Sequence, residues 1–483
     1  MIKYIVANYG EIIMEQRNKN VSPEEIERQK SIIHSVHEAI RRSSKMKRAF
    51  VETYGCQQNV SDSEMLIGMI KEMGYEMTDN REEADLIIYN TCAVRENAEL
   101  KVFGNLGALK HLKAKRPELI VGVCGCMMQQ KDIQEQIKRR YKHVGLVFGT
   151  HSLYRFPELL HEALLDGTRV FDICNDGTIA ENMPVARSGG PSEWVSVMYG
   201  CNNFCTYCIV PYVRGRERSR DKAKILEEVR TLAQGGCKEI TLLGQNVNSY
   251  GNDLDEDIDF ADLLRMVHEV NGIERIRFMT SHPKDISDRL IDAMAELPKV
   301  CKQLHLPVQA GNNEVLRRMN RRYTREQYLE KIAKIKAKMP GITLTSDIIV
   351  GFPGETNEQF EDTLDMLRQV RYDSVFSFIY SRRPGTPAAK MDDVITPGEK
   401  KENFNKLLEV QDEISREIND SYVGRELTVL VEGPSKTNAD VLTGRTEGGK
   451  TVNFCGDSSL IGSFAQVKIT EARTWSLIGE VVD

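Results

Sequence analysis

Residues 194–208 read WVSVMYGCNNFCTYC, an apolar run followed at once by three cysteines, Cys201, Cys205 and Cys208. Three thiolates from one short loop can hold three irons of a cubic 4Fe–4S cluster and leave the fourth iron without a protein ligand. A structural zinc site is the alternative, but it needs four protein ligands, and no further Cys or His follows at the usual spacing. The stretch therefore predicts a reactive iron–sulfur cluster directly after a strand.

This run is the first of a series between residues 187 and 418, in which helical stretches follow or separate the apolar runs. The runs are WVSVMYG, EITLLGQN, RIRFMTS, QLHLPVQ, LTSDIIVGFPG and SVFSFIYS. Six such βα units predict a full or partial barrel. In barrels of this kind the loops after the strands carry the active site.

The segment 48–165 has the same alternation. Its runs AFVETYG, DLIIYNT, ELIVGVCG and VGLVFGT are separated by helical stretches, which predicts an α/β domain with a parallel sheet. Ser61 followed by Glu64 predicts a capping box that opens the first helix. Residues 1–47 form an extension with a helix-prone stretch from Pro23 to Arg42, and residues 166–187 read as a linker.

The last segment, residues 420–483, contains short alternating strands with Gly-rich turns, such as ELTVLVEG and SFAQVKITEA. This pattern predicts a small β-barrel.

A second group of cysteines lies in the N-terminal α/β segment. Cys56, Cys92 and Cys126 each stand at or just past the carboxyl end of a predicted parallel strand, and such ends meet at one edge of a sheet. They predict a second three-cysteine cluster site. Three unrelated, small apolar cysteines are the alternative. Cys124 competes with Cys126 as third ligand, and spacing alone does not separate the two.

Composition limits the class of protein. The chain has 483 residues, 41% of them hydrophobic, and eleven cysteines, an odd number. In a reducing compartment such cysteines are expected to be free, catalytic or metal-bound rather than paired as disulfides. No apolar stretch approaches the roughly 20 residues that a membrane span requires, and residues 1–14 do not form a signal-peptide core. We expect a cytoplasmic protein.

A net charge of −6 argues against indiscriminate nucleic-acid binding, so any RNA site must be a local basic patch. The candidates are RGRERSR, with Arg214, Arg216, Arg218 and Arg220, and RRMNRR, with Arg317, Arg318, Arg321 and Arg322. The alternative is a solvated charged face.

The CxxxCxxC spacing after the first strand of the series resembles the radical S-adenosylmethionine (SAM) superfamily. The resemblance implies a complete or partial βα barrel whose open iron binds SAM and splits off a 5′-deoxyadenosyl radical. It also implies that residues after successive strands line the SAM site: Gly244, Gln245, Ser281, His305, Gln309, Asp347, Gly351 and Pro353. For His305, a satisfied core histidine is an equal alternative.

With TYGCQQN, NTCAVRE and GCM, the chain resembles the methylthiotransferase family of radical-SAM enzymes over nearly all of residues 48–483. In that family the terminal barrel is of the TRAM type, and GCM favours Cys126 over Cys124 as third ligand. CIVPYVRGRERSR and LLGQNVNSYG look most like the branch that methylthiolates N6-isopentenyladenosine beside the anticodon of tRNA. Sister branches act on threonylcarbamoyl-adenosine of tRNA and on a ribosomal-protein aspartate.

The resemblance implies two 4Fe–4S clusters and two SAM molecules per product. One SAM would methylate a sulfur held at the Cys56, Cys92 and Cys126 cluster, and the other would generate the radical at the Cys201, Cys205 and Cys208 cluster. The implied partners are a tRNA anticodon loop and an electron donor such as flavodoxin or ferredoxin. The main alternative of another class is an iron–sulfur protein that binds tRNA or carries electrons without turnover.

Overall fold

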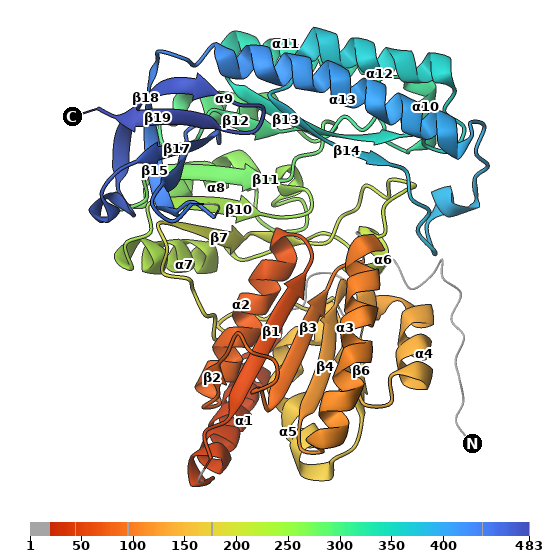
Figure 1. Cartoon of the computed structure of the whole chain (residues 1–483), viewed down its shortest axis with the longest axis vertical. Helices are drawn as coiled ribbons and strands as arrows, with labels where there is room; N and C mark the ends of the chain where they lie inside the picture. Colours follow the sequence, from red (N-terminus) through yellow and green to blue (C-terminus); the bar gives the residue numbers. More distant parts are fainter. Residues whose placement is uncertain (1–19, 44, 94–95, 175–176, 437, 483) are drawn as a thin grey trace. The chain divides into compact units, whose positions relative to one another are not determined.

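The computed structural model describes residues 20–43, 45–93, 96–174, 177–436 and 438–482 (Figure 1). The chain divides into two compact units. Unit 1 contains the residues up to Ala186 with Val210–Arg220 and Asn252–Asp257, and unit 2 contains Arg187–Ile209, Asp221–Gly251 and the chain from Ile258 onward. The chain therefore returns to unit 1 twice after first leaving it.

Unit 1 is built on a six-stranded parallel sheet. Its strands are β1 (Arg48–Tyr54), β2 (Glu76–Met77), β3 (Leu86–Thr91), β4 (Ile120–Gly125), β5 (Leu146–Phe148) and β6 (Val170–Asp172). Their order is β2-β1-β3-β4-β5-β6, and every neighbouring pair is parallel. All residues of β3 are buried, as expected for a parallel strand covered on both faces.

Helices cover this sheet on both faces (Figure 1). They are α1 (Pro23–Arg42), α2 (Gln57–Glu72), α3 (Glu96–Lys115), α4 (Lys131–Arg140) and α5 (Phe156–Asp166), with the short turns η1 (Cys126–Gln129) and η2 (Thr150–Arg155). One apolar cluster joins α1, α2 and α5, and a second joins α3 and α4. The returning segment adds α6 (Val210–Val213) and β9 (Arg218–Ser219).

The helix predicted between Pro23 and Arg42 is confirmed as α1. The Ser22 side chain accepts a hydrogen bond from the Glu25 amide and so caps the helix. Ile33 and Val36 on its apolar face are buried in the core of unit 1. The part of the extension that the structure describes is therefore packed into this unit.

Two predictions for unit 1 are wrong. The stretch 166–187 contains strand β6, which pairs with β5 from Val170 to Asp172. Helix α2 begins directly after Cys56, so Ser61 and Glu64 lie inside it and do not open it. Asn59 occupies the expected position of the capping partner, since its side chain accepts from the Cys56 amide at 3.4 Å.

The core of unit 2 contains two three-stranded parallel sheets. One has the order β11 (Arg275–Met279), β10 (Glu239–Leu243), β7 (Ser192–Ser196), and the other β12 (Gln303–His305), β13 (Thr343–Val350), β14 (Ser374–Ile379). A parallel bridge between Ile276 and Val300 continues the first sheet toward the second. The predicted series of βα units is thus confirmed as a partial barrel, with β8 (Met198–Tyr199) after its first strand.

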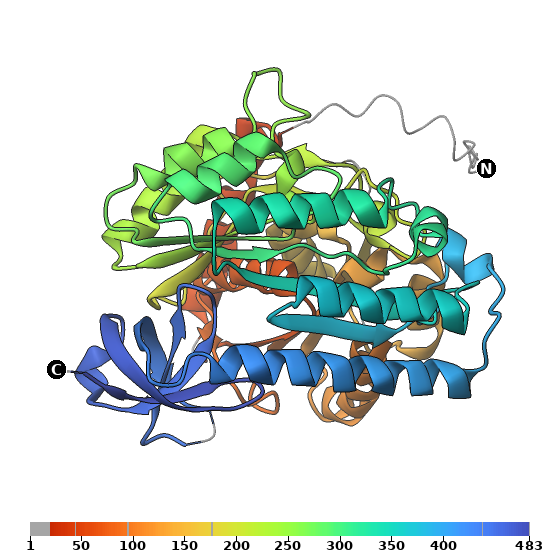
Figure 2. The same ribbon diagram turned by 90° about the horizontal axis from the view of Figure 1, so that it is seen from above.

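Helices alternate with these strands along the chain. They are α7 (Lys222–Gln234), α8 (Phe260–His268), α9 (Asp288–Glu296), α10 (Asn313–Arg318), α11 (Arg325–Lys338), α12 (Asn357–Val370) and α13 (Pro397–Asp420), with the turns η3 (Val247–Ser249) and η4 (Pro387–Lys390). Figure 2 shows α11, α12 and α13 side by side over the β12–β14 sheet. Among the described helices, none has the length and apolarity needed to cross a bilayer.

A closed five-stranded barrel ends unit 2, as predicted (Figure 2). Its strands are β15 (Glu426–Pro434), β16 (Leu442–Thr446), β17 (Thr451–Cys455), β18 (Phe464–Ala472) and β19 (Leu477–Val481), with the turn η5 (Ser458–Leu460). Arg275 and Arg277 of β11 attach the barrel to the core. Arg275 donates to the Thr428 and Arg445 carbonyls, and Arg277 donates to the Thr446 and Glu447 carbonyls.

Candidate active site

The cysteine loop of unit 2 is held by residues that precede α11. The Thr206 amide donates to the Met319 carbonyl at 3.0 Å, and the Asn320 amide group donates to the Phe204 carbonyl at 3.0 Å. Within the loop, the Cys208 amide donates to the Cys205 carbonyl at 2.9 Å. The three predicted ligands Cys201, Cys205 and Cys208 thus stand on a short loop that backbone and amide contacts fix.

A buried arginine contacts this loop directly. Arg321 is only 4% exposed, and its guanidinium lies 3.5 Å from the Cys205 sulfur. It also donates to the Tyr323 hydroxyl at 3.0 Å and to the Pro307 carbonyl. A guanidinium beside a thiolate offsets the negative charge that a thiolate-ligated cluster brings into a buried site.

The residues predicted for the SAM site lie at the ends of neighbouring strands. Gln245, just after β10, accepts from the Gly200 amide beside Cys201. The His305 imidazole lies 3.5 Å from the Asp347 carboxylate. The backbone amide of Gln309 donates to the backbone carbonyl of Asp347 at 2.9 Å. Two pairings are therefore present: Gln245 with the cysteine loop, and His305 and Gln309 with Asp347.

The glycines of this group stand where a side chain would collide. A Cβ on Gly244 would come within 2.5 Å of the Met198 side chain, and one on Gly351 within 2.5 Å of the Lys400 side chain. Gly351 also has a φ of +68°, a conformation that favours glycine. Pro353, two residues further on, is buried.

Several buried polar atoms at this edge have no hydrogen-bond partner in the part of the chain that the structure describes. They are Asn246 Oδ1, Ser281 Oγ and His282 Nε2. Buried polar groups are normally satisfied, so orphaned atoms at strand ends fit a site that a polar ligand completes. Sequence reasoning found Ser281 but missed Asn246 and His282, which carry no motif beyond their place beside Gln245 and Ser281.

The cysteines of unit 1 stand at three neighbouring strand ends. Cys56 follows β1 and precedes α2, Cys92 directly follows β3, and Cys126 follows β4 and opens η1. A hydrogen bond with Cys92, aided by the charge of Arg214, lowers the pKa of Cys56 to about 5. Burial raises the pKa of Cys126 to about 11.

Arg214 joins this group from the returning segment of unit 1. Its side chain is buried, pairs with the Asp62 carboxylate at 2.6 Å and interacts electrostatically with both Cys56 and Cys126. The chain thus supplies a buried guanidinium to each cysteine triplet. No sequence signal points to this role, because both arginines belong to charged stretches that are, in the sequence, only candidates for RNA binding or for a solvated face.

Cys124 has a different environment from Cys126. It lies within β4, is fully buried and belongs to the apolar cluster that joins α1, α2 and α5. Burial raises its pKa well above the ordinary value of a thiol. These surroundings favour Cys126 as the third ligand.

The described side chains include no three His, Cys, Asp or Glu groups placed to bind one metal ion. In a 4Fe–4S cluster each cysteine binds a different iron, so its ligands stand farther apart than those of a single ion. The interaction of Arg214 with Cys56 and Cys126, and of Cys92 with Cys56, fits a negatively charged cluster. The contact of Arg321 with Cys205 fits a second one.

Comparisons with known proteins agree with this architecture. Residues 195–367 match the radical SAM superfamily, residues 420–482 the TRAM domain, and residues 48–149 the uncharacterized protein family UPF0004. The solved structure of the radical S-adenosylmethionine methyltransferase TsrM from Kitasatospora setae covers 71% of this chain and 75% of its own, at 14% identity and a TM-score of 0.52. Fold and cysteine loop together define a radical-SAM enzyme.

Curated relatives match nearly end to end. The tRNA-2-methylthio-N(6)-dimethylallyladenosine synthase of Acetivibrio thermocellus is 58% identical over 97% of this chain and 98% of its own. The protein of the same name from Clostridioides difficile is 53% identical over 97% of this chain and 100% of its own. The chain belongs to the tRNA-2-methylthio-N(6)-dimethylallyladenosine synthase family, a family of radical-SAM methylthiotransferases that use SAM and two 4Fe–4S clusters.

Proposed function

We propose that this enzyme converts N6-isopentenyladenosine next to the anticodon of tRNA into its 2-methylthio derivative. The observation that carries the proposal is a second cysteine triplet, present beside the radical-SAM loop. Cys56 and Cys126 interact with Arg214, and Cys92 interacts with Cys56. When bound, the two clusters and SAM supply the carbon radical and the sulfur that replace an unactivated C–H bond with S–CH3. A radical-SAM core needs one cysteine triplet for its cluster, so it does not account for the second triplet.

The residues of the chain have separable tasks in this proposal. Cys201, Cys205 and Cys208 hold the radical cluster, and Arg321 offsets its charge at Cys205. Cys56, Cys92 and Cys126 hold the other cluster beside Arg214. The following residues line the SAM site: Gly244, Gln245, Ser281, His305, Gln309, Asp347, Gly351 and Pro353.

The partners are proposed by the same reasoning. The substrate tRNA presents its adenosine from the anticodon loop, where an unstacked base can be held by a protein. The TRAM-type barrel is a candidate for additional RNA contact. A small electron-transfer protein such as flavodoxin or ferredoxin reduces the radical cluster, and the enzyme works in the cytoplasm.

The test is deletion of the gene in its host, followed by mass spectrometry of nucleosides from total tRNA. We expect the 2-methylthio form of isopentenyladenosine to disappear, the unthiolated nucleoside to accumulate, and re-expression to restore the product. Persistence of the 2-methylthio nucleoside would contradict the proposal. The threonylcarbamoyl nucleoside and the ribosomal aspartate would then be measured in the same strain.

Re-expressed variants test the ligand set. Cys→Ala at any of Cys56, Cys92, Cys126, Cys201, Cys205 or Cys208 is expected to abolish the product, because an incomplete triplet cannot hold its cluster. Cys455→Ala is the matched control, since Cys455 is an exposed thiol on the terminal barrel. Full product from one of the six variants would remove that cysteine from the ligand set.

A further inference from the structure

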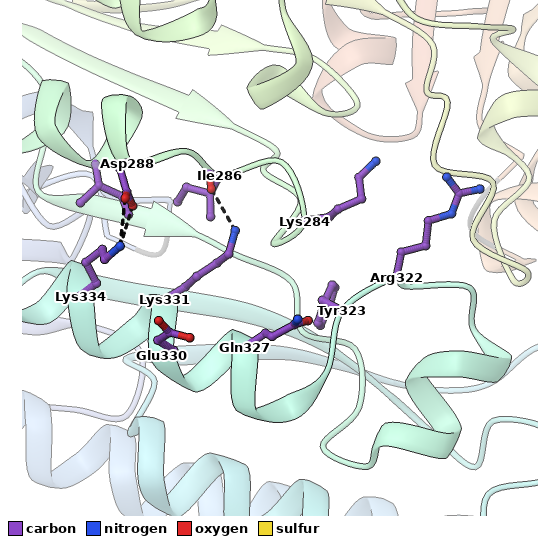
Figure 3. Close-up of a pocket in the computed structure, with 10 residues that line it drawn as sticks. Lys284, Ile286, Asp288, Arg322, Tyr323, Gln327, Glu330, Lys331 and Lys334 are labelled. Carbon is purple, nitrogen blue, oxygen red and sulfur yellow. Dashed lines mark hydrogen bonds and ion pairs between the residues drawn. The ribbon is translucent and has the colours of Figure 1, made fainter.

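A basic pocket of about 310 Å³ lies in unit 2 between the loop after β11 and the start of α11 (Figure 3). Its walls contain the following residues: Lys284, Ile286, Asp288, Ile291, Arg322, Tyr323, Gln327, Glu330, Lys331 and Lys334. Four cationic side chains therefore face two carboxylates, in a chain whose net charge is −6. Such a local excess of positive charge attracts anions.

Two of the four cationic side chains already have partners among the residues that line the pocket. Lys334 pairs with Asp288 at 2.9 Å, and Lys331 donates to the Ile286 carbonyl at 3.0 Å (Figure 3). Burial lowers the pKa of Lys331. These contacts fix the shape of the pocket and leave the other two cations to meet a ligand.

Lys284, in the loop after β11, and Arg322, in the segment before α11, both extend away from Lys331 and Lys334 (Figure 3). Arg322 is exposed and makes no hydrogen bond or ion pair with any residue that the structure describes. Among the described residues, Lys284 forms an ion pair with its neighbour Asp285, at 3.1 Å. The other carboxylate oxygen of Asp285 already accepts from Asn246 at 2.7 Å.

The backbone holds Arg322 in an unusual conformation. Its φ is +58°, in the left-handed region that costs a residue with a side chain about 1 kcal/mol. Asn320 has a φ of +60°, so Arg321 between them can turn toward Cys205 while Arg322 turns to the pocket. Tyr323, which lines the pocket, accepts a hydrogen bond from Arg321, and Arg321 in turn contacts Cys205, so the pocket adjoins the radical cysteine loop.

The other arginines of the RRMNRR stretch have internal partners. Arg317 forms two hydrogen bonds to Glu314, Arg318 bonds Glu314 and the Gly354 carbonyl, and Arg321 is buried. Arg322 is thus the member of this stretch that is placed to meet an outside ligand.

We propose that this pocket binds a backbone phosphate of the tRNA strand that carries the modified adenosine. The proposal rests on the proposed function, because it assumes that tRNA is the substrate. Arg and Lys are the usual partners of phosphate oxygens. Tyr323 already bonds Arg321 and the Val308 carbonyl through its hydroxyl, so the pocket offers charge for a phosphate and little for reading a base.

The test is binding of unthiolated tRNA, taken from the deletion strain, to the cluster-loaded full chain across about 50–200 mM salt. We expect the double variant Lys284→Ala with Arg322→Ala to raise Kd about tenfold and to reduce the salt slope by about one. The charge-preserving Arg322→Lys is expected to keep most of the slope. Arg317→Ala, which replaces another exposed arginine of the same stretch, is the control and should leave both Kd and the salt slope unchanged.

Each contrary result has its own meaning. If the unsubstituted chain binds tRNA and the folded double variant binds it equally well with the same salt slope, the pocket assignment is wrong and the proposed function stands. If the unsubstituted chain does not bind tRNA, both fail. If inorganic phosphate raises the melting temperature through Lys284 and Arg322 while tRNA affinity is unaffected, the pocket serves a free anion and the RNA assignment is overturned.

Discussion

At the scale of single residues, several arginines of the two charged stretches are buried and contact other side chains. Arg214 and Arg321 belong to charged stretches for which the sequence leaves an RNA-binding patch and a solvated face open. Both are buried instead, Arg214 beside Cys56 and Cys126 and Arg321 beside Cys205. Arg218 and Arg220 are also buried, the first beside His151 and the second in an ion pair with Glu181. A run of charges in sequence therefore says little about which charge faces solvent, because tertiary packing decides it.

Loss of Arg321 should destabilise unit 2. In Arg321→Met the Cys205 sulfur, the Tyr323 hydroxyl and the Pro307 carbonyl lose a buried donor, and we expect the free energy of unfolding to fall by about 3 kcal/mol. Urea denaturation measures the change. For Arg317→Met, in which the lost arginine is exposed, the free energy of unfolding should fall by less than about 1 kcal/mol. Equal losses in the two variants would contradict the buried role of Arg321.

Glu355 should make the stability of the protein depend on pH near neutrality. Burial raises the pKa of Glu355 to about 7, and its carboxyl accepts from the Gly351 amide at 2.6 Å. Because the folded state holds the proton more tightly than the unfolded chain, stability falls as pH rises from about 4.5 to 7, by on the order of 3 kcal/mol.

Glu355→Gln tests this dependence, since the amide keeps an acceptor for Gly351 and has no proton to lose. Urea unfolding at pH 5, 6, 7 and 8 should show the unsubstituted protein losing stability relative to the variant as pH rises. Parallel curves for the two proteins would mean that Glu355 does not titrate in this range.

At the scale of elements, the apolar runs predicted the long strands well. AFVETYG and DLIIYNT correspond to β1 and β3. All residues of β3 are buried, so it leaves a continuous apolar signal, whereas β1 is mostly half-buried. Strand β6 was missed because three residues, Val170–Asp172, carry no such signal and depend on β5 for pairing. The start of α2 was misplaced because Cys56 is not an ordinary capping residue.

In the candidate site, too, some features could be predicted from the sequence and others could not. The CxxxCxxC spacing predicted the triplet Cys201, Cys205 and Cys208, and positions at predicted strand ends predicted the second triplet and the polar loops around the first. The contacts of Arg214 with Cys56 and of Arg321 with Cys205 could not be predicted, because they join residues 158 and 116 positions apart whose proximity depends on the finished fold.

Because Arg277 attaches the terminal barrel to β11, we expect Arg277→Met to lower the free energy of unfolding. Arg277 pairs with the buried Glu239 at 3.0 Å and donates to two barrel carbonyls. Its loss leaves the buried Glu239 carboxylate only the Arg275 guanidinium at 3.9 Å and the Ser192 hydroxyl at 3.2 Å among the described side chains. We therefore expect destabilisation of about 3 kcal/mol and faster proteolysis between α13 and β15. The double variant Glu239→Gln with Arg277→Met should recover part of this loss. If the double variant is no more stable than Arg277→Met, the lost contacts with the barrel carbonyls, and not the Glu239 carboxylate, cause the destabilisation.

At the scale of the whole molecule, each compact unit contains one complete cysteine triplet. Replacing Cys56, Cys92 and Cys126 together by Ala should therefore remove about half of the bound iron and leave the other cluster in place. The triple replacement of Cys201, Cys205 and Cys208 should remove the other half. Iron analysis and electron paramagnetic resonance of anaerobically purified protein measure both, with Cys455→Ala as control. Complete loss of iron from either triple variant would show that the two sites do not load independently.

The returning segments of unit 1 also set an order of synthesis. Arg214, the partner of Asp62, is translated only after β7 and the radical cysteine loop of unit 2. Until it emerges from the ribosome, the nascent N-terminal sheet lacks the guanidinium that balances Asp62 and flanks Cys56 and Cys126. Unit 1 can complete its packing only after Asp257 has been added, so two unfinished units must coexist on the growing chain.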